Sequence, residues 1–203
     1  MKRMARSMFR FLSRPPETVT IADADYLLRL PVVGDYRAWT GLRSESRAFL
    51  EPWEPAWRAE DLTEGAFRDR VARSEQEFSA GQAVALLLFS RRSDALLGGI
   101  TIGHIRRGAA QSCMIGYWMG ERHAGHGHMS AAVGLVIPYI FSVLQLHRIE
   151  AACIPDNDRS VRLLEKAGFE QEGYLRKYLK INGQWRDHLL FSRLAPPDGP
   201  TEV

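Results

Sequence analysis

The pattern of apolar and polar positions in the second half of the chain predicts a strand, a helix and a second strand. Met114–Met119 is an apolar segment of strand length. Met129–Leu146 is an apolar run without charge, too long for a strand and therefore predicted to be a helix. Pro138 lies inside this helix, where it removes a hydrogen bond and is expected to kink the axis. Arg148–Ile154 follows as the next strand.

The remaining periodicities predict a mixed α/β domain. Apolar residues predict a strand at 26–30, a helix from Asp35, a helix from a capping box near Asp61–Glu64, and strands at 83–90 and 95–105. Asn182-Gly183, between two alternating segments, predicts a terminal β-hairpin.

A glycine-punctuated turn, Arg122-His-Ala-Gly125-His-Gly127, joins the strand to the long helix. Main-chain N–H groups at a helix N-terminus favour an anion, and glycines let a phosphate approach the backbone closely. The turn has neither the frame of a Walker loop nor the third glycine of a dinucleotide fingerprint. It predicts capture of a phosphorylated cofactor, with an ordinary strand-to-helix turn as the alternative.

A second motif begins after the strand that ends at Ile154. Asn157 and Ser160 stand at the start of a short helix, which is expected to end at Gly168 in a left-handed conformation. Asn157 or Asp158 is a candidate helix cap. Capping and ligand binding are compatible roles for the same side chain.

Together the two motifs resemble the coenzyme A sites of the GCN5-related N-acetyltransferases (GNAT). Arg122-x-x-Gly-x-Gly is similar to their pyrophosphate loop, and Asn157-x-x-Ser160 followed by Leu164-Glu-Lys-Ala-Gly-Phe is similar to their distal motif. The resemblance implies a mixed, mostly antiparallel sheet flanked by helices, with acetyl-CoA as the acetyl donor and no metal. The cofactor-binding residues that it implies are Trp118, Met119, Arg122, His123, Ala124, Gly125, His126, Gly127, His128, Asn157 and Ser160.

Two further segments resemble the bacterial ribosomal-protein-alanine N-acetyltransferases of the RimJ and RimL type. These are Phe49-Leu-Glu-Pro-Trp53-Glu54-Pro and the stretch from Tyr178 to His188, so the likeness covers roughly residues 24–195. It implies acetyl transfer to the α-amine of a protein N-terminus, with a ribosomal protein as a candidate acceptor. The acceptor-binding residues that it implies are Trp53, Glu54, Trp185 and Asp187.

The resemblance also implies direct transfer in a ternary complex. Backbone N–H groups near Trp118 and Met119 would stabilise the oxyanion. Where many relatives carry a tyrosine acid, this chain has Leu164, so Ser160 or water would protonate the leaving thiolate. Glu54 is the first candidate for a base and Glu150 the second, while an acid without catalytic role is the alternative for either.

Composition is that of an ordinary soluble protein: 203 residues, 45% apolar and 25% charged. The two cysteines, Cys113 and Cys153, form no disulfide framework, which predicts a cytoplasmic protein. The first fourteen residues contribute five of the positive charges, so the net charge of +3 becomes +3 − 5 = −2 for residues 15–203. The domain itself is therefore not predicted to bind nucleic acid.

We expect a basic tail at residues 1–16, one domain at 17–195 and a C-terminal tail at 196–203. The basic tail is open to weak contact with RNA or a membrane surface, or to no role. Polar residues and Pro138 argue against a membrane span at 129–146, and the loop histidines lack the spacing of a zinc site.

Three functions remain open from the sequence. Acetylation of a protein N-terminus is the first, by a monomer or homodimer. The alternatives are acetylation of a small-molecule amine and a non-catalytic regulator that binds coenzyme A or RNA.

Overall fold

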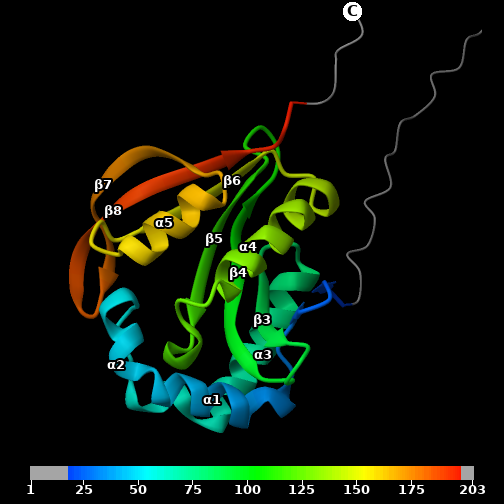
Figure 1. Cartoon of the computed structure of the whole chain (residues 1–203), viewed down its shortest axis with the longest axis vertical. Helices are drawn as coiled ribbons and strands as arrows, with labels where there is room; N and C mark the ends of the chain where they lie inside the picture. Colours follow the sequence, from blue (N-terminus) through cyan, green and yellow to red (C-terminus); the bar gives the residue numbers. More distant parts are fainter. Residues whose placement is uncertain (1–17, 198–203) are drawn as a thin grey trace, which may run out of the picture.

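The fold is built on one eight-stranded sheet with strand order β1-β2-β3-β4-β5-β6-β8-β7 (Figure 1). The computed structural model describes residues 18–197. Neighbouring strands are antiparallel except β5 and β6, which are parallel. The strands are β1 (Thr20–Ala22), β2 (Tyr26–Arg29), β3 (Val84–Ser90), β4 (Leu96–Arg106), β5 (Ser112–Met119), β6 (Arg148–Cys153), β7 (Glu170–Ile181) and β8 (Gln184–Leu194). The predicted mixed, mostly antiparallel sheet is confirmed.

Helices cover both faces of this sheet. They are α1 (Tyr36–Glu45), α2 (Arg47–Leu50), α3 (Glu64–Ser79), α4 (His128–Pro138) and α5 (Asp158–Lys166). Leu86 and Leu88 of β3 belong to the large core cluster that includes α4 and α5, whereas Leu87 and Phe89 belong to a smaller cluster with α1 and α3. The alternation follows the two-residue period of a strand buried on both sides.

The prediction of one continuous helix at 129–146 was wrong about where the α-helix ends. The α-helix ends at Pro138 and continues as a π-helical turn, Tyr139–Val143. The N–H of Leu144 donates to the carbonyl of Tyr139 at 3.0 Å, five residues back. Because Pro138 has no N–H, the regular hydrogen-bond ladder is interrupted near this point, and the wider turn follows it.

Local turn signals agree with the structure. Asn182 and Gly183 have φ values of 42° and 78°, as a two-residue type I′ hairpin turn requires. Gly168, at φ 76°, ends α5 in the left-handed region. The capping box predicted at Asp61–Glu64 was wrong: Asp61 lies in a 3-10 turn, and Thr63 caps α3, its hydroxyl accepting from the N–H of Ala66 at 3.3 Å.

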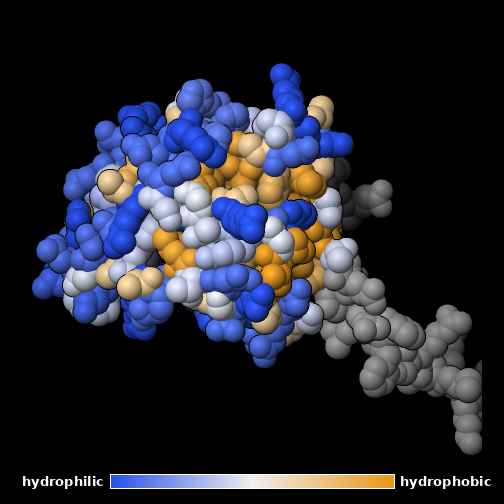
Figure 2. Space-filling view, turned by 90° about the horizontal axis from the view of Figure 1, so that it is seen from below, coloured by the Kyte–Doolittle hydropathy of each residue, from blue (hydrophilic) through white to orange (hydrophobic). Residues whose placement is uncertain are grey.

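Seen from below, the surface is mostly hydrophilic, with hydrophobic residues gathered toward the centre and the right of the view (Figure 2). Within residues 18–197, no helix is long and apolar enough to cross a membrane.

Candidate active site

The site begins where two parallel strands separate. β5 and β6 are paired only from Ser112 and Arg148 to Ile115 and Ala151, although β5 runs on to Met119. Gly120 donates its N–H to Leu97 of β4 at 2.9 Å. Because successive residues of a strand point their N–H groups to opposite sides, the N–H of Met119 faces the gap between β5 and β6.

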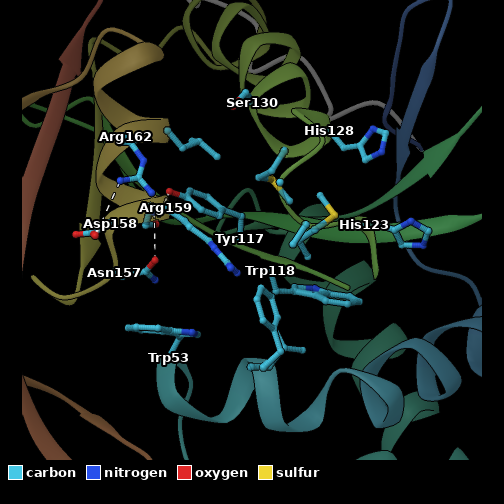
Figure 3. Close-up of a pocket in the computed structure, with 18 of the residues that line it drawn as sticks. Trp53, Tyr117, Trp118, His123, His128, Ser130, Asn157, Asp158, Arg159 and Arg162 are labelled. Carbon is cyan, nitrogen blue, oxygen red and sulfur yellow. Dashed lines mark hydrogen bonds and ion pairs between the residues drawn. The ribbon is translucent and has the colours of Figure 1, made fainter. Parts of the chain in front are cut away.

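A cavity of about 870 Å³ lies at this gap (Figure 3). It is bounded by α2 and the loop after it, by the end of β5, by the glycine loop with the first residues of α4, and by α5. Eleven of the predicted site residues line it: Trp53, Glu54, Trp118, Met119, His123, Ala124, Gly125, Gly127, His128, Asn157 and Ser160.

The glycine loop presents unpaired main-chain donors to this cavity. Gly125 and Gly127 have φ values of 83° and 82°, which turn the backbone into the start of α4. Among the described residues, no acceptor receives the N–H groups of Gly125 to Ser130. A row of free N–H groups at a helix N-terminus is suited to an anion such as a diphosphate.

Cations on α5 face the same cavity. Arg159, Arg162 and Lys166 line it, with Arg159 and Arg162 above Trp53 in Figure 3. Arg162 has a carboxylate neighbour in Asp158, at 3.9 Å. The cavity therefore offers positive charge from side chains as well as from the backbone.

The three loop histidines lie close together. The rings of His126 and His128 are stacked with centroids 5.9 Å apart, and His128 Nδ1 lies 2.8 Å from the Tyr26 hydroxyl. Burial, and then the neighbouring Arg122, lower the pKa of His123 below its ordinary value. A neutral imidazole can donate a hydrogen bond to an anion without a charge of its own.

Arg122 and His126 do not line the cavity. Arg122 instead forms an ion pair with Glu45 at 3.0 Å. Across residues 18–197, no group of three histidine, cysteine, aspartate or glutamate side chains is arranged to hold a metal ion.

Ser160 is positioned by two neighbours. Its N–H donates to Asn157 Oδ1 at 3.2 Å, so Asn157 caps α5 and also lines the cavity. Its hydroxyl lies 2.7 Å from the Tyr117 hydroxyl, a partner that the sequence did not predict. Burial raises the pKa of Tyr117 above its ordinary value, so the phenol stays neutral near pH 7. Leu164, by contrast, is buried in the large core cluster and does not line the cavity.

Glu54 is held by a network of aromatic and basic side chains. Arg43 donates to both carboxylate oxygens, at 2.8 and 2.6 Å, and Trp57 Nε1 donates to Oε2 at 2.9 Å. The Arg43 guanidinium lies over the Trp57 ring at 4.3 Å and the Trp118 ring at 4.9 Å. The carboxylate is therefore fixed in place, at the edge of the cavity, by three donors.

The β7–β8 hairpin touches the same loop at its tip, where the N–H of Asn182 donates to the carbonyl of Glu54 at 2.8 Å. Trp185 and Asp187 do not line the cavity. Trp185 is 59% exposed, and Asp187 accepts from the Tyr174 hydroxyl and the Lys177 N–H, both at 2.7 Å. The structure thus places the hairpin tip beside the cavity loop, while Trp185 and Asp187 lie outside the residues that enclose the cavity.

Glu150 lies apart from the other predicted residues. Its neighbours Ile149 and Ala151 pack in the large core cluster, so its side chain points to the opposite face of the sheet. There it pairs with Arg148 at 2.9 Å and Arg106 at 2.7 Å, at a second cavity of about 620 Å³.

Comparison with known proteins gives consistent matches. Residues 25–170 match the model of the acetyltransferase (GNAT) domain. A probable N-acetyltransferase of Bacillus subtilis, YjcK, is 42% identical over 78% of this chain and 87% of its own. The ribosomal protein uS5-alanine N-acetyltransferase of Escherichia coli is 34% identical over 94% of this chain and 97% of its own. The solved structure of Mycobacterium smegmatis RimJ in complex with CoA-disulfide has a TM-score of 0.81 and 30% identity, with 89% and 88% of the two chains covered.

Proposed function

Because the chain belongs to the GNAT acetyltransferase family and is an N-acetyltransferase that uses acetyl-CoA, we propose that its acceptor is the α-amine of a protein N-terminus. A ribosomal protein is the proposed acceptor protein, which would place the reaction in the cytoplasm. The Escherichia coli relative, an alanine N-acetyltransferase of a ribosomal protein, supports this choice.

The proposed position of the acetyl donor rests on one observation, the row of free N–H groups from Gly125 to Ser130. These groups, with Arg159 and Arg162 opposite, would hold the diphosphate of coenzyme A. The bound donor supplies an acetyl thioester. The N–H of Met119, which faces the gap between β5 and β6, is the proposed hydrogen-bond donor to the thioester oxygen.

Ser160 is the proposed relay of a proton to the leaving thiolate: its hydroxyl gives up one proton and takes another from water, and the proton released by the acetylated amine replaces the one that the water gave. A neutral Tyr117 phenol can donate to Ser160 Oγ, which leaves the serine proton free to point into the cavity. Tyr117 would therefore act as a positioning residue. Asn157 holds the serine's backbone through the cap of α5.

Glu54 is the proposed acceptor-side carboxylate. Two donors occupy Oε2 and one occupies Oε1, so Oε1 retains an acceptor site for a water molecule or for the incoming amine. A strong base is unnecessary, because about a tenth of an α-amine with a pKa near 8 is neutral at pH 7. Glu150 points to the opposite face of the sheet and lines the second cavity, so it does not reach this acceptor site.

The side chains of Trp53, Trp185 and Asp187 are the proposed borders of the acceptor site. Trp53 is 36% exposed and lines the cavity, and the hairpin tip bonds to the same loop. A flexible peptide terminus can enter between these two elements.

The test is incubation with acetyl-CoA and short peptides that begin with Ala, Ser, Thr or Met, each with a free or a blocked N-terminus. Intact mass should show acetylation of free α-amines only, and a Gly125→Glu, Gly127→Glu double variant should lose it. If small amines such as polyamines are acetylated and no peptide is, the proposed acceptor is wrong. If coenzyme A binds but no amine is acetylated, the catalytic role itself fails.

A further inference from the structure

The end of the β7–β8 hairpin, residues 174–188, concentrates positive charge; we call it the hairpin arm. Arg176, Lys177 and Lys180 are exposed, and none of them forms an ion pair within residues 18–197. Many other arginines of the described chain do pair with carboxylates. The sequence has only four lysines, and two of them are here. The overall charge of −2 for residues 15–203 hides this local excess.

Exposed aromatic side chains share the arm with these cations. Trp185 is 59% exposed, Tyr174 is 54% exposed and Tyr178 is 36% exposed. Lys180 pairs with Trp185 across the hairpin, so the ammonium and the indole stand on the same face. Rings that remain this exposed have a large apolar face available to a partner.

Edge protection accounts for only part of this surface. β7 is the last strand of the sheet, and lysines on an edge strand discourage pairing with other chains. Trp185 is exposed and Leu179 is 41% exposed. Both weaken the protection of the edge, because exposed apolar groups promote association with other chains. The combination fits a binding surface better than a protected edge.

The arm also lies beside the acceptor side of the cavity. Its tip donates to the Glu54 carbonyl, and Figure 1 shows the hairpin reaching down to α2. In the view from below, the side of the molecule on which the hairpin lies is predominantly hydrophilic (Figure 2). A partner bound to the arm would therefore lie next to the amine that is acetylated.

We propose that the hairpin arm binds single-stranded RNA. Arg176, Lys177 and Lys180 would contact phosphates, and Trp185 with Tyr178 would stack on bases. Phosphate and base alternate along a strand of RNA, which matches cations interleaved with exposed rings, whereas an acidic protein would use the cations alone. The proposal that the arm binds RNA does not depend on the proposed function. The further idea that this binding brings the enzyme to an RNA-bound acceptor does rest on it.

The test is the fluorescence anisotropy of a labelled oligouridylate, titrated with the full chain at several salt concentrations. A triple variant, Arg176→Ser, Lys177→Ser and Lys180→Ser, should bind roughly tenfold more weakly, and the slope of log affinity against log salt should fall by about 2. Trp185→Ala should weaken binding without changing that slope. If the triple variant does not fold, Lys177→Ser and Lys180→Ser give the same test singly, each lowering the slope by about 0.7.

Two control variants locate the binding. A triple variant on exposed arginines elsewhere, Arg58→Ser, Arg68→Ser and Arg73→Ser, should bind as the parent does. A second control replaces the five basic residues of the N-terminal tail, which lies outside the described residues, by serine: Lys2, Arg3, Arg6, Arg10 and Arg14. This variant should still lose about 2 from the slope of log affinity against log salt when the arm triple variant is added to it. Binding that survives the arm variant, that falls equally in the control triple, or that polyglutamate competes as well as RNA overturns the proposal.

A separate readout distinguishes this proposal from the proposed function. Acetylation of free peptides, measured without RNA, should be unchanged in the arm triple variant. If the arm triple variant loses RNA binding but still acetylates peptides, the result supports RNA binding by the arm. If the parent protein acetylates no peptide, the proposed acceptor is wrong, and the proposal of RNA binding is unaffected.

Discussion

The hydroxyl of Tyr117, on β5, lies 2.7 Å from the hydroxyl of Ser160, on α5, across the gap where β5 and β6 separate. Ser160→Ala should lower kcat by about a hundredfold, at the lower end of general-acid effects because a thiolate is a good leaving group. KM for acetyl-CoA should change little. Steady-state kinetics with a saturating peptide measure both, and an unchanged kcat would remove Ser160 from the chemistry.

Tyr117→Phe separates positioning from proton donation. It keeps the ring and loses the hydrogen bond to Ser160, so we expect a smaller fall in kcat, about tenfold, with the melting temperature nearly unchanged. Because Ser160 then loses its fixed orientation, the pH profile of kcat should also change. The double variant should be no slower than Ser160→Ala alone; additive losses would show that the two hydroxyls act separately.

Gly125→Ala and Gly127→Ala should impair donor binding through the backbone. A side chain at φ near 80° costs about 1 kcal/mol or more, even though open space surrounds both positions. We expect KM for acetyl-CoA to rise at least severalfold with KM for peptide unchanged. Gly134→Ala, in the exposed interior of α4, is the matched control and should raise the free energy of unfolding by about 0.5–1 kcal/mol with normal donor binding.

Glu54→Gln should affect both stability and acceptor binding. The Arg43 and Glu54 side chains are only 13% and 19% exposed, so loss of the charge leaves a largely buried guanidinium unpaired, at a cost of about 2 kcal/mol. KM for peptide should rise more than KM for acetyl-CoA. Glu51→Gln breaks the exposed pair with Arg47 and should cost under about 0.5 kcal/mol in thermal or denaturant unfolding. Equal losses in the two variants would contradict a special role for Glu54.

His188 should make stability depend on pH. Its side chain is 2% exposed, and burial is the main cause that lowers its pKa below the ordinary 6.5. The unfolded chain therefore takes up a proton at a pH where the folded chain does not. Stability from this group is present above about pH 6.5 and falls as the pH drops, by at most about 1.4 kcal/mol per pH unit.

Urea unfolding at pH 7, 6 and 5 measures this slope. His188→Gln removes the titrating group and should flatten it, while His147→Gln, at an exposed position, serves as the control. A slope that is identical in the parent and in His188→Gln would show that burial of His188 has no such effect.

The sequence predicted the features whose cause is local. The Asn182-Gly183 turn, the left-handed Gly168 and the glycine loop before α4 each depend on a few adjacent residues, and each is present. The three-residue strand β1 escaped prediction because it is too short to show a period. Pro138 was recognised as an interruption, but the π-helical form of the next turn was not predicted.

The site was predicted only where a motif lies on one segment. Tyr117 meets Ser160 from 43 residues away, and Glu54 meets Arg43 through the packing of a loop against α1, so neither contact has a signature in the sequence. Tyr117 stood in a predicted strand next to Trp118, yet nothing local indicated which face of the sheet its hydroxyl would reach. Side-chain pairing across elements needs the three-dimensional arrangement.

The donors of the glycine loop belong to the main chain, so no substitution except proline can delete them. The side chains of His123, Ala124 and His126 can therefore change in evolution while the loop keeps its main-chain N–H donors, provided that the two glycines preserve its shape. Homologous enzymes should then differ in the side chains of this loop while they keep its two glycines. Under the proposed function, selectivity among acceptors can diversify on α2 and the hairpin while the glycine loop, the proposed donor side of the site, stays unchanged.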